Sequence, residues 1–127
     1  MRYDVITAKS AAQAAADVQS YAKQHGFGTL HVYNLKEILG SKGFPQTREC
    51  QVLEVYSPEQ ANRVLALDFT MNVVLPCRIS VYEHEGKTWI GMIRPKAMLT
   101  MLSGAPELRA VADEIETAMV KIIDAAR

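Results

Sequence analysis

The sequence predicts an α+β fold in which helices cover one face of a curved antiparallel sheet. A long β-branched run over residues 71–84 is joined by the short turn Glu85-Gly86 to a second β-rich run over residues 87–93, which is typical of an antiparallel hairpin. Residues 106–125 carry apolar side chains at alternating spacings of three and four, which predicts an amphipathic helix. We expect that helix to cover the sheet, with a seam between two subunits as the alternative.

Length and charge exclude several functions. The chain has 127 residues, which is enough for one domain over residues 1–127 with its own core. Its 14 Lys and Arg balance 14 Asp and Glu, so no net field draws it to nucleic acid or to an anionic membrane. No apolar run approaches the ~20 residues of a membrane span, and we expect a cytoplasmic protein. Its 2 cysteines and 3 scattered histidines predict reduced thiols, no structural metal and no cofactor.

The first half of the chain alternates strands with helix signals. Ser10 with Gln13 three residues later is a capping-box pattern, and Gly26 stands where a helix usually ends. The expected elements are a strand over residues 2–8, a helix over 10–25, a strand over 27–33, a short helix over 35–39 and a strand over 50–56.

The second half opens with Ser57-Pro58-Glu59, the preferred order of cap, proline and acid at the start of a helix. Pro106 with Glu107 marks the start of the last helix in the same way. The expected elements are a helix over residues 57–69, strands over 71–84 and 87–93, a short Met-rich helix over 97–102 and the closing helix over 106–125.

Cys77 is the most interesting residue of the long strand. Because strand side chains alternate between faces, one face would carry Val73, Leu75, Cys77, Ile79 and Val81, and the other Val74, Pro76, Arg78, Ser80 and Tyr82. This parity turns Cys77 toward the core, where a cysteine usually acts as a small apolar residue. Pro76 favours a functional alternative, because proline inside a strand marks an edge or a bulge that can redirect the next side chain.

The hairpin register decides what faces Cys77. With a two-residue loop at Glu85-Gly86, Tyr82 pairs with Trp89 and Cys77 meets Arg94, whose guanidinium would favour the thiolate and lower the pKa of the thiol. A three-residue loop would put Ile93 opposite Cys77 instead. The Tyr82 and Trp89 pair lies on the face away from the helices, either as cross-strand packing or as a contact surface. Further ligand or interface candidates are Tyr56, Pro76, Met98 and Met101.

Several short motifs together resemble one family. Phe27-Gly28-Thr29-Leu30, Leu35-Lys36-Glu37-Ile38-Leu39, Ser57-Pro58 and Leu75-Pro76-Cys77, in this order, are similar to the bacterial and archaeal domain-of-unknown-function family 302 from about Tyr3 to Ala125. The resemblance implies a TATA-binding-protein-like arrangement of strand, helix, four strands and helix, and it implies a dimer. A shared fold does not carry DNA binding with it.

Two departures from that family bear on the chemistry. Tyr56-Ser57-Pro58 stands where the family usually has Cys-Asn-Pro, and Arg94-Pro95 stands where it usually has Asp-Pro. The first departure removes one of the family's two familiar cysteines and argues against two-cysteine chemistry. The second replaces an acid with a base near Cys77, which favours single-thiol chemistry there.

No complete catalytic set is visible, and Gly26-Phe27-Gly28 lacks the third glycine of a dinucleotide motif. An enzyme is therefore the third of three hypotheses. The first is a cytoplasmic homodimeric binding or interaction module with a pocket between the sheet and the segment from Met98 to Met101. The second is a single-thiol sulfur (persulfide) carrier or redox protein that uses Cys77, with Arg94 stabilising its anion and a sulfur-transfer protein as its partner.

Overall fold

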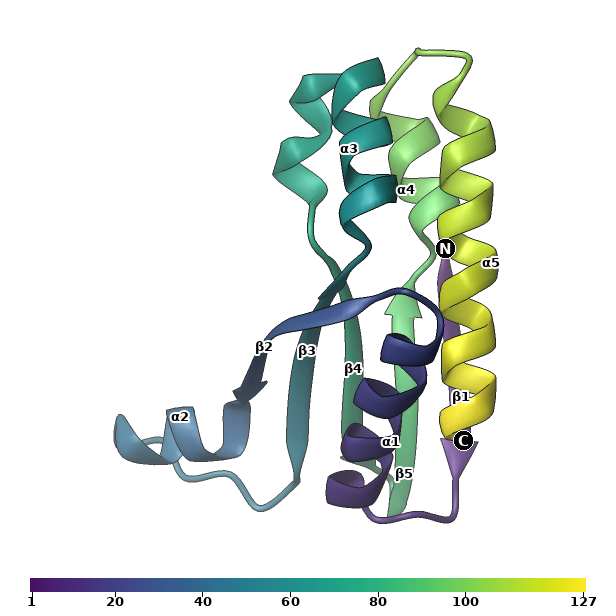
Figure 1. Cartoon of the computed structure of the whole chain (residues 1–127). Coiled ribbons are helices and arrows are strands. Elements are labelled where there is room, and N and C mark those ends of the chain that lie inside the picture. Colours follow the sequence, from purple (N-terminus) through teal and green to yellow (C-terminus); the bar gives the residue numbers. More distant parts are fainter.

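The structure, a computed structural model, describes all residues from Met1 to Arg127. One five-stranded antiparallel sheet has the strand order β1-β5-β4-β3-β2, and the two long helices α1 and α5 lie across one of its faces (Figure 1). The elements are β1 (Arg2–Thr7), α1 (Ala11–Gln24), β2 (Gly28–Asn34), α2 (Leu35–Ser41), β3 (Cys50–Tyr56), α3 (Pro58–Leu67), the 3-10 helix η1 (Phe69–Val74), β4 (Cys77–His84), β5 (Lys87–Ile93), α4 (Pro95–Leu102) and α5 (Leu108–Ala126). The α+β class and the curved antiparallel sheet are therefore confirmed.

The core lies between the sheet and the two long helices. In α1, the side chain of Ser10 accepts a hydrogen bond from the Gln13 amide and Gly26 follows the helix end with a positive φ, as the sequence predicted. The closing helix α5 covers the sheet with its apolar stripe, which in the last turns consists of Ile122, Ile123 and Ala126. Its fully buried residues include Leu108, Ala112, Met119 and Ile122.

The predicted strand over residues 71–84 is wrong in its first part. Residues up to Val74 form η1, Leu75 and Pro76 connect it to the sheet through a cis peptide bond, and β4 begins only at Cys77. The shared face expected for Val73, Leu75 and Cys77 therefore does not exist, whereas Cys77, Ile79 and Val81 do face the core. The β-branched run becomes helical because Asp68 caps it, accepting hydrogen bonds from the amide and the hydroxyl of Thr70 at 3.1 and 2.5 Å.

The hairpin turn is confirmed as a two-residue loop. Glu85 and Gly86 both have positive φ, 53° and 73°, the backbone of a tight turn that matches strand twist. The β4–β5 ladder runs from His84↔Lys87 through Tyr82↔Trp89 and ends at Ser80↔Gly91.

Beyond Ser80 and Gly91 the two central strands separate. The register would pair Arg78 with Ile93, but that pairing does not form. Each strand stays with its outer neighbour instead, since Cys77 pairs with Val55 of β3 and Ile93 pairs with Arg2 of β1. The sheet is therefore open at this end, where η1 and α4 lie (Figure 1).

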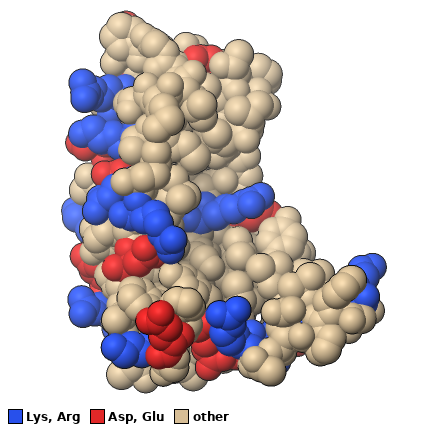
Figure 2. Space-filling view, turned by 180° about the vertical axis from the view of Figure 1, so that it is seen from behind, with Lys and Arg blue, Asp and Glu red and all other residues tan.

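Strand β2 and helix α2 form an arm. It projects from the body next to the β3 edge, and α2 has no buried residue (Figure 1). The register of β2 shifts between Thr29 and His31, where the strand bends at a bulge. Seen from behind, the arm encloses a concave side of the molecule (Figure 2).

Candidate functional site

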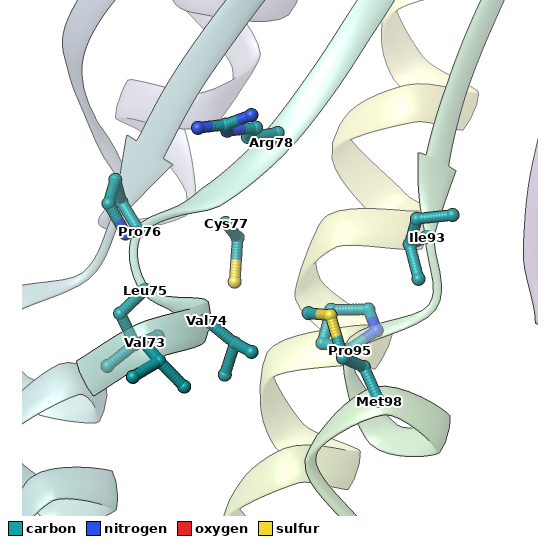
Figure 3. Close-up of a pocket in the computed structure, with 9 residues that line it drawn as sticks. All are labelled: Val73, Val74, Leu75, Pro76, Cys77, Arg78, Ile93, Pro95 and Met98. Carbon is teal, nitrogen blue, oxygen red and sulfur yellow. The ribbon is translucent and has the colours of Figure 1, made fainter. Parts of the chain in front are cut away.

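The open end of the sheet contains an apolar pocket of about 310 Å³ (Figure 3). Two segments distant in sequence supply its walls: residues 73–78, from η1 into β4, and residues 93–98, from the end of β5 into the first turn of α4. The lining residues are Val73, Val74, Leu75, Pro76, Cys77, Arg78, Ile93, Pro95 and Met98. None of them is a His, Asp or Glu, and Cys77 is the one side chain among them that can lose a proton near neutral or alkaline pH.

Asp68 fixes the η1 wall of the pocket against α4. One carboxylate oxygen caps η1 through Thr70, and the other accepts a hydrogen bond of 2.5 Å from the hydroxyl of Ser103, the residue that ends α4. These hydrogen bonds, the one from Ser103 first, lower the pKa of Asp68. A single carboxylate therefore joins the elements that carry Val74 and Met98.

Cys77 lies at the base of this pocket. It is the first residue of β4, and its sulfur points into the space between Val74 and Met98 (Figure 3). The residue is 7% exposed, and burial raises the pKa of the thiol to about 11. Cys77 is thus a neutral thiol at physiological pH and forms part of the apolar lining.

The expected pairing of Cys77 with Arg94 is wrong. The Arg94 guanidinium lies 4.9 Å from the ring centroid of Tyr3, its Nε donates to the Arg2 carbonyl at 3.3 Å, and its Nη1 lies 3.7 Å from a carboxylate oxygen of Glu116. The ladder that would have brought Arg94 opposite Cys77 ends three pairs earlier, at Ser80↔Gly91, because β4 and β5 diverge. Arg94 consequently belongs to the contact between β1 and α5.

Arg78 is the one charged residue that lines the pocket, and reasoning from parity placed it only on the outward face. Its side chain is 69% exposed, and its Nη2 lies 3.9 Å from Glu54 Oε2, at the outer limit of an ion pair. Glu54 instead accepts a short hydrogen bond of 2.7 Å from the hydroxyl of Tyr33. The Arg78 guanidinium makes no hydrogen bond within the chain.

The aromatic pair lies elsewhere, on the sheet face away from the helices. The rings of Tyr82 and Trp89 are stacked at 11° with their centroids 6.5 Å apart, and the Trp89 indole donates to the His84 carbonyl at 3.2 Å. The Tyr82 hydroxyl accepts a hydrogen bond from Arg2 at 3.3 Å. The pair is therefore cross-strand packing, and neither ring lines the apolar pocket.

The remaining candidates divide between the pocket and its surroundings. Pro76 and Met98 line the pocket, whereas Met101 is 68% exposed and lies outside it. Tyr56 lies on another side of Cys77, beside a gap of about 10 Å³ that also contacts Gln60. The buried Oε1 of Gln60 has no hydrogen-bond partner, but the gap has the size of a single water molecule and admits no ligand.

No three His, Cys, Asp or Glu side chains converge in a way that could hold a metal ion. None of the helices combines the length and the apolar character needed to cross a bilayer.

The two cysteines are far apart. Cys50 and Cys77 lie toward opposite ends of the β3–β4 pair, where Cys50 pairs with Tyr82 and Cys77 pairs with Val55, so they do not form a disulfide.

Comparison with known proteins places the chain in a family. The family model described as domain of unknown function DUF302 matches residues 3–126. The chain belongs to the DUF302 family. A crystal structure of an uncharacterised conserved DUF302 protein from Bacillus stearothermophilus is similar, with 31% identity, a TM-score of 0.93, and coverage of 99% of this chain and 98% of that one. A search of curated proteins found no match.

This result confirms the family resemblance and agrees with the α+β class, and it indicates no specific function. The pocket could be predicted only in part from the sequence. Leu75-Pro76-Cys77 marked one wall, but Ile93 and Pro95 were not expected to line a pocket, because a regular ladder would have left no space beside them. The signal that could have found them is Pro95, two residues after the end of the strand, which starts a helix.

Proposed function

We propose that this DUF302 protein is a non-enzymatic binding module that holds a small apolar molecule, or the apolar part of a larger one, in the pocket at the open end of the sheet. The observation that supports this most directly is the separation of β4 and β5 around an apolar space of about 310 Å³. That volume lies at the lower end of the range for ligand pockets, and it is about twice the ~150 Å³ cavity that holds benzene.

The test uses two matched tryptophan substitutions on α4. Met98→Trp should fill the pocket, because Met98 lines it, whereas Met101→Trp should not, because Met101 is exposed outside it. With octanamide as a neutral apolar probe, we expect Met98→Trp to weaken binding at least about tenfold and Met101→Trp to leave it unchanged. Far-UV circular dichroism and thermal unfolding show that both variants are folded. Equal effects of the two substitutions, or no binding to the native protein, would contradict the proposal.

We also propose that the protein is a homodimer that uses the arm. Leu30, Ile38, Leu39 and Phe44 are exposed on β2, α2 and the loop after it, and α2 buries no residue in the single chain. Exposed apolar side chains gathered in one region are typical of a subunit contact. Light scattering at micromolar concentration should give a dimer, which Phe44→Asp disrupts and Phe69→Asp, a change at the equally exposed Phe69 of η1, does not. A monomeric native protein would contradict this proposal. In that case Trp89→Ala should leave the measured molecular mass unchanged.

A thiol or persulfide carrier in sulfur metabolism that uses Cys77 is a second and weaker proposal. Access to the pocket favours it, and the raised pKa of the buried thiol disfavours it. Alkylation of Cys77 at neutral pH faster than that of Cys50 would favour the carrier.

We also propose a cytoplasmic location and a TATA-binding-protein-like arrangement. The arrangement is supported by the order strand, helix, four strands and helix, apart from the short helices between them.

A further inference from the structure

From the position of Arg78 at the rim of the apolar pocket, we infer that the ligand is an amphipathic anion, with its apolar part in the pocket and a carboxylate or similar group bound by Arg78. The inference rests on the proposed function and specifies its ligand class. Arg78 is the one charged side chain among the nine residues that line the pocket, and it lies where β4 leaves the pocket for the open face (Figure 3).

The guanidinium of Arg78 has free hydrogen-bond donors. It makes no hydrogen bond in the chain, and its contact with Glu54 is a loose one of 3.9 Å. In contrast, Arg2 donates from two nitrogens to Asp4, and Arg63 is paired with Glu114. A planar guanidinium with a free edge fits a carboxylate with two parallel hydrogen bonds. Because its side chain is 69% exposed, Arg78 can turn toward a ligand without breaking an existing bond.

Two acids lie near this position, and they differ in how their charges are balanced. Glu54 accepts from the Tyr33 hydroxyl at 2.7 Å. Asp4 accepts from Arg2 at 2.9 and 3.3 Å, and it lies over Gly91, where a Cβ would come within 2.0 Å of its Oδ1. The charge of Asp4 is met by Arg2, whereas Glu54 is hydrogen-bonded by a neutral hydroxyl and has its one ion pair, at 3.9 Å, with Arg78. The proposed binding therefore requires Arg78 to turn from this loose contact toward the anion.

The pocket continues onto the open face of the sheet. A shallow groove of about 260 Å³ on that face shares Arg78 and Ile93 with the pocket and is also lined by Ser80 and Tyr82. The Ser80 hydroxyl has no hydrogen-bond partner in the chain and lies two residues from Arg78 on the same face. Seen from behind, the middle of the upper part of this face is free of Lys, Arg, Asp and Glu, and Lys and Arg cross the molecule below it with some acidic side chains beside them (Figure 2). An apolar pocket with a cation at its rim suits a molecule with an apolar tail and an anionic head.

The test compares octanoate with octanamide, which has the same chain and a planar head group without charge. Binding to the native protein, to Arg78→Met and to the control Arg109→Met is measured by isothermal titration at low salt. Arg78→Met keeps an apolar stem and removes the charge. Arg109 is also exposed and has no ion pair, but it lies on α5 outside the pocket.

We expect Arg78→Met to weaken octanoate binding about tenfold and to change octanamide binding less than about twofold, because one charge-assisted contact is lost for octanoate alone. Arg109→Met should change neither, and raising the salt concentration should reduce the preference for octanoate, because Arg78 is exposed. Equal weakening of both probes by Arg78→Met, or no effect on either, would overturn the role of Arg78 and leave the pocket proposal standing. If neither probe binds the folded native protein, the pocket proposal fails as well.

Discussion

The thiol of Cys77 offers the clearest quantitative prediction. Cys77 is 7% exposed at the base of the apolar pocket, and burial raises its pKa from the ordinary 9.0 to about 11. At about pH 8, a pKa of 9.0 leaves roughly one thiol in ten as thiolate, whereas a pKa of about 11 leaves roughly one in a thousand. Since the thiolate is the nucleophile, Cys77 should be alkylated about 100-fold more slowly than an ordinary cysteine, and more slowly still where burial blocks the reagent.

The same shift links the thiol to stability at high pH. A thiol that holds its proton more tightly in the folded state stabilises that state fully below about pH 9. Between about pH 9 and pH 11 the unfolded chain loses its proton first, so the free energy of unfolding falls as the pH rises. Two pKa units correspond to at most about 2–3 kcal/mol. Cys77→Ala should remove this component of the pH dependence, although it also costs some packing at every pH.

The assay is alkylation with iodoacetamide, followed by peptide mass spectrometry, with Cys50 as the internal reference because it is only half-buried. Urea unfolding of the native protein and of Cys77→Ala at about pH 8 and pH 10.5 gives the second readout. Alkylation of Cys77 at the rate of Cys50 or faster at neutral pH would refute the reasoning. So would identical pH profiles of stability for the native protein and the variant.

Three further predictions concern the scaffold of the site. Gly91→Ala should cost about 1–2 kcal/mol in urea unfolding, because its Cβ would come within 2.0 Å of Asp4 Oδ1, and the cost should largely vanish in an Asp4→Ala background; additive effects would contradict this. Ser10→Ala should cost about 1 kcal/mol by loss of the α1 cap, and a change within error would refute the role of the cap. Asp68→Asn should speed amide hydrogen exchange in η1 but not in α1, because Asp68 joins η1 to Ser103. In the native protein, exchange in η1 should also speed up as the pH falls through the lowered pKa of Asp68. Unchanged exchange in η1 would contradict this role of Asp68.

The sequence was informative where local chemistry decides the structure. The turn at Glu85-Gly86 set the register of the hairpin, so that the pairing of Tyr82 with Trp89 could be read directly from the loop length. The buried stripe of α5 and the caps of the helices followed from periodicity and from the residue types at the helix ends. All of these depend on neighbours along the chain or on one regular ladder.

The site itself depends on a departure from regularity. Parity arguments assume that a ladder continues, and here it stops at Ser80 and Gly91, so that Arg94 never reaches Cys77. The β-branched pair Val73 and Val74 favours a strand, but the cap from Asp68 and the hydrogen bond that Asp68 accepts from Ser103 place it in a 3-10 helix. The second of these contacts joins residues 35 positions apart and has no local signature. The pocket is built by such long-range contacts. The sequence therefore predicted that Cys77 and Pro76 lie near a site, but it did not predict the shape of the pocket.

The most direct test of the proposed binding function uses the methionine methyl groups. The chain contains 6 methionines, of which Met98 lines the pocket and Met101 lies outside it on the same helix. In a titration with octanoate followed by methyl NMR of methionine-labelled protein, we predict a saturable shift of the Met98 resonance and no shift of Met101. No shift of Met98, or equal unsaturable shifts of both, would contradict binding in the pocket.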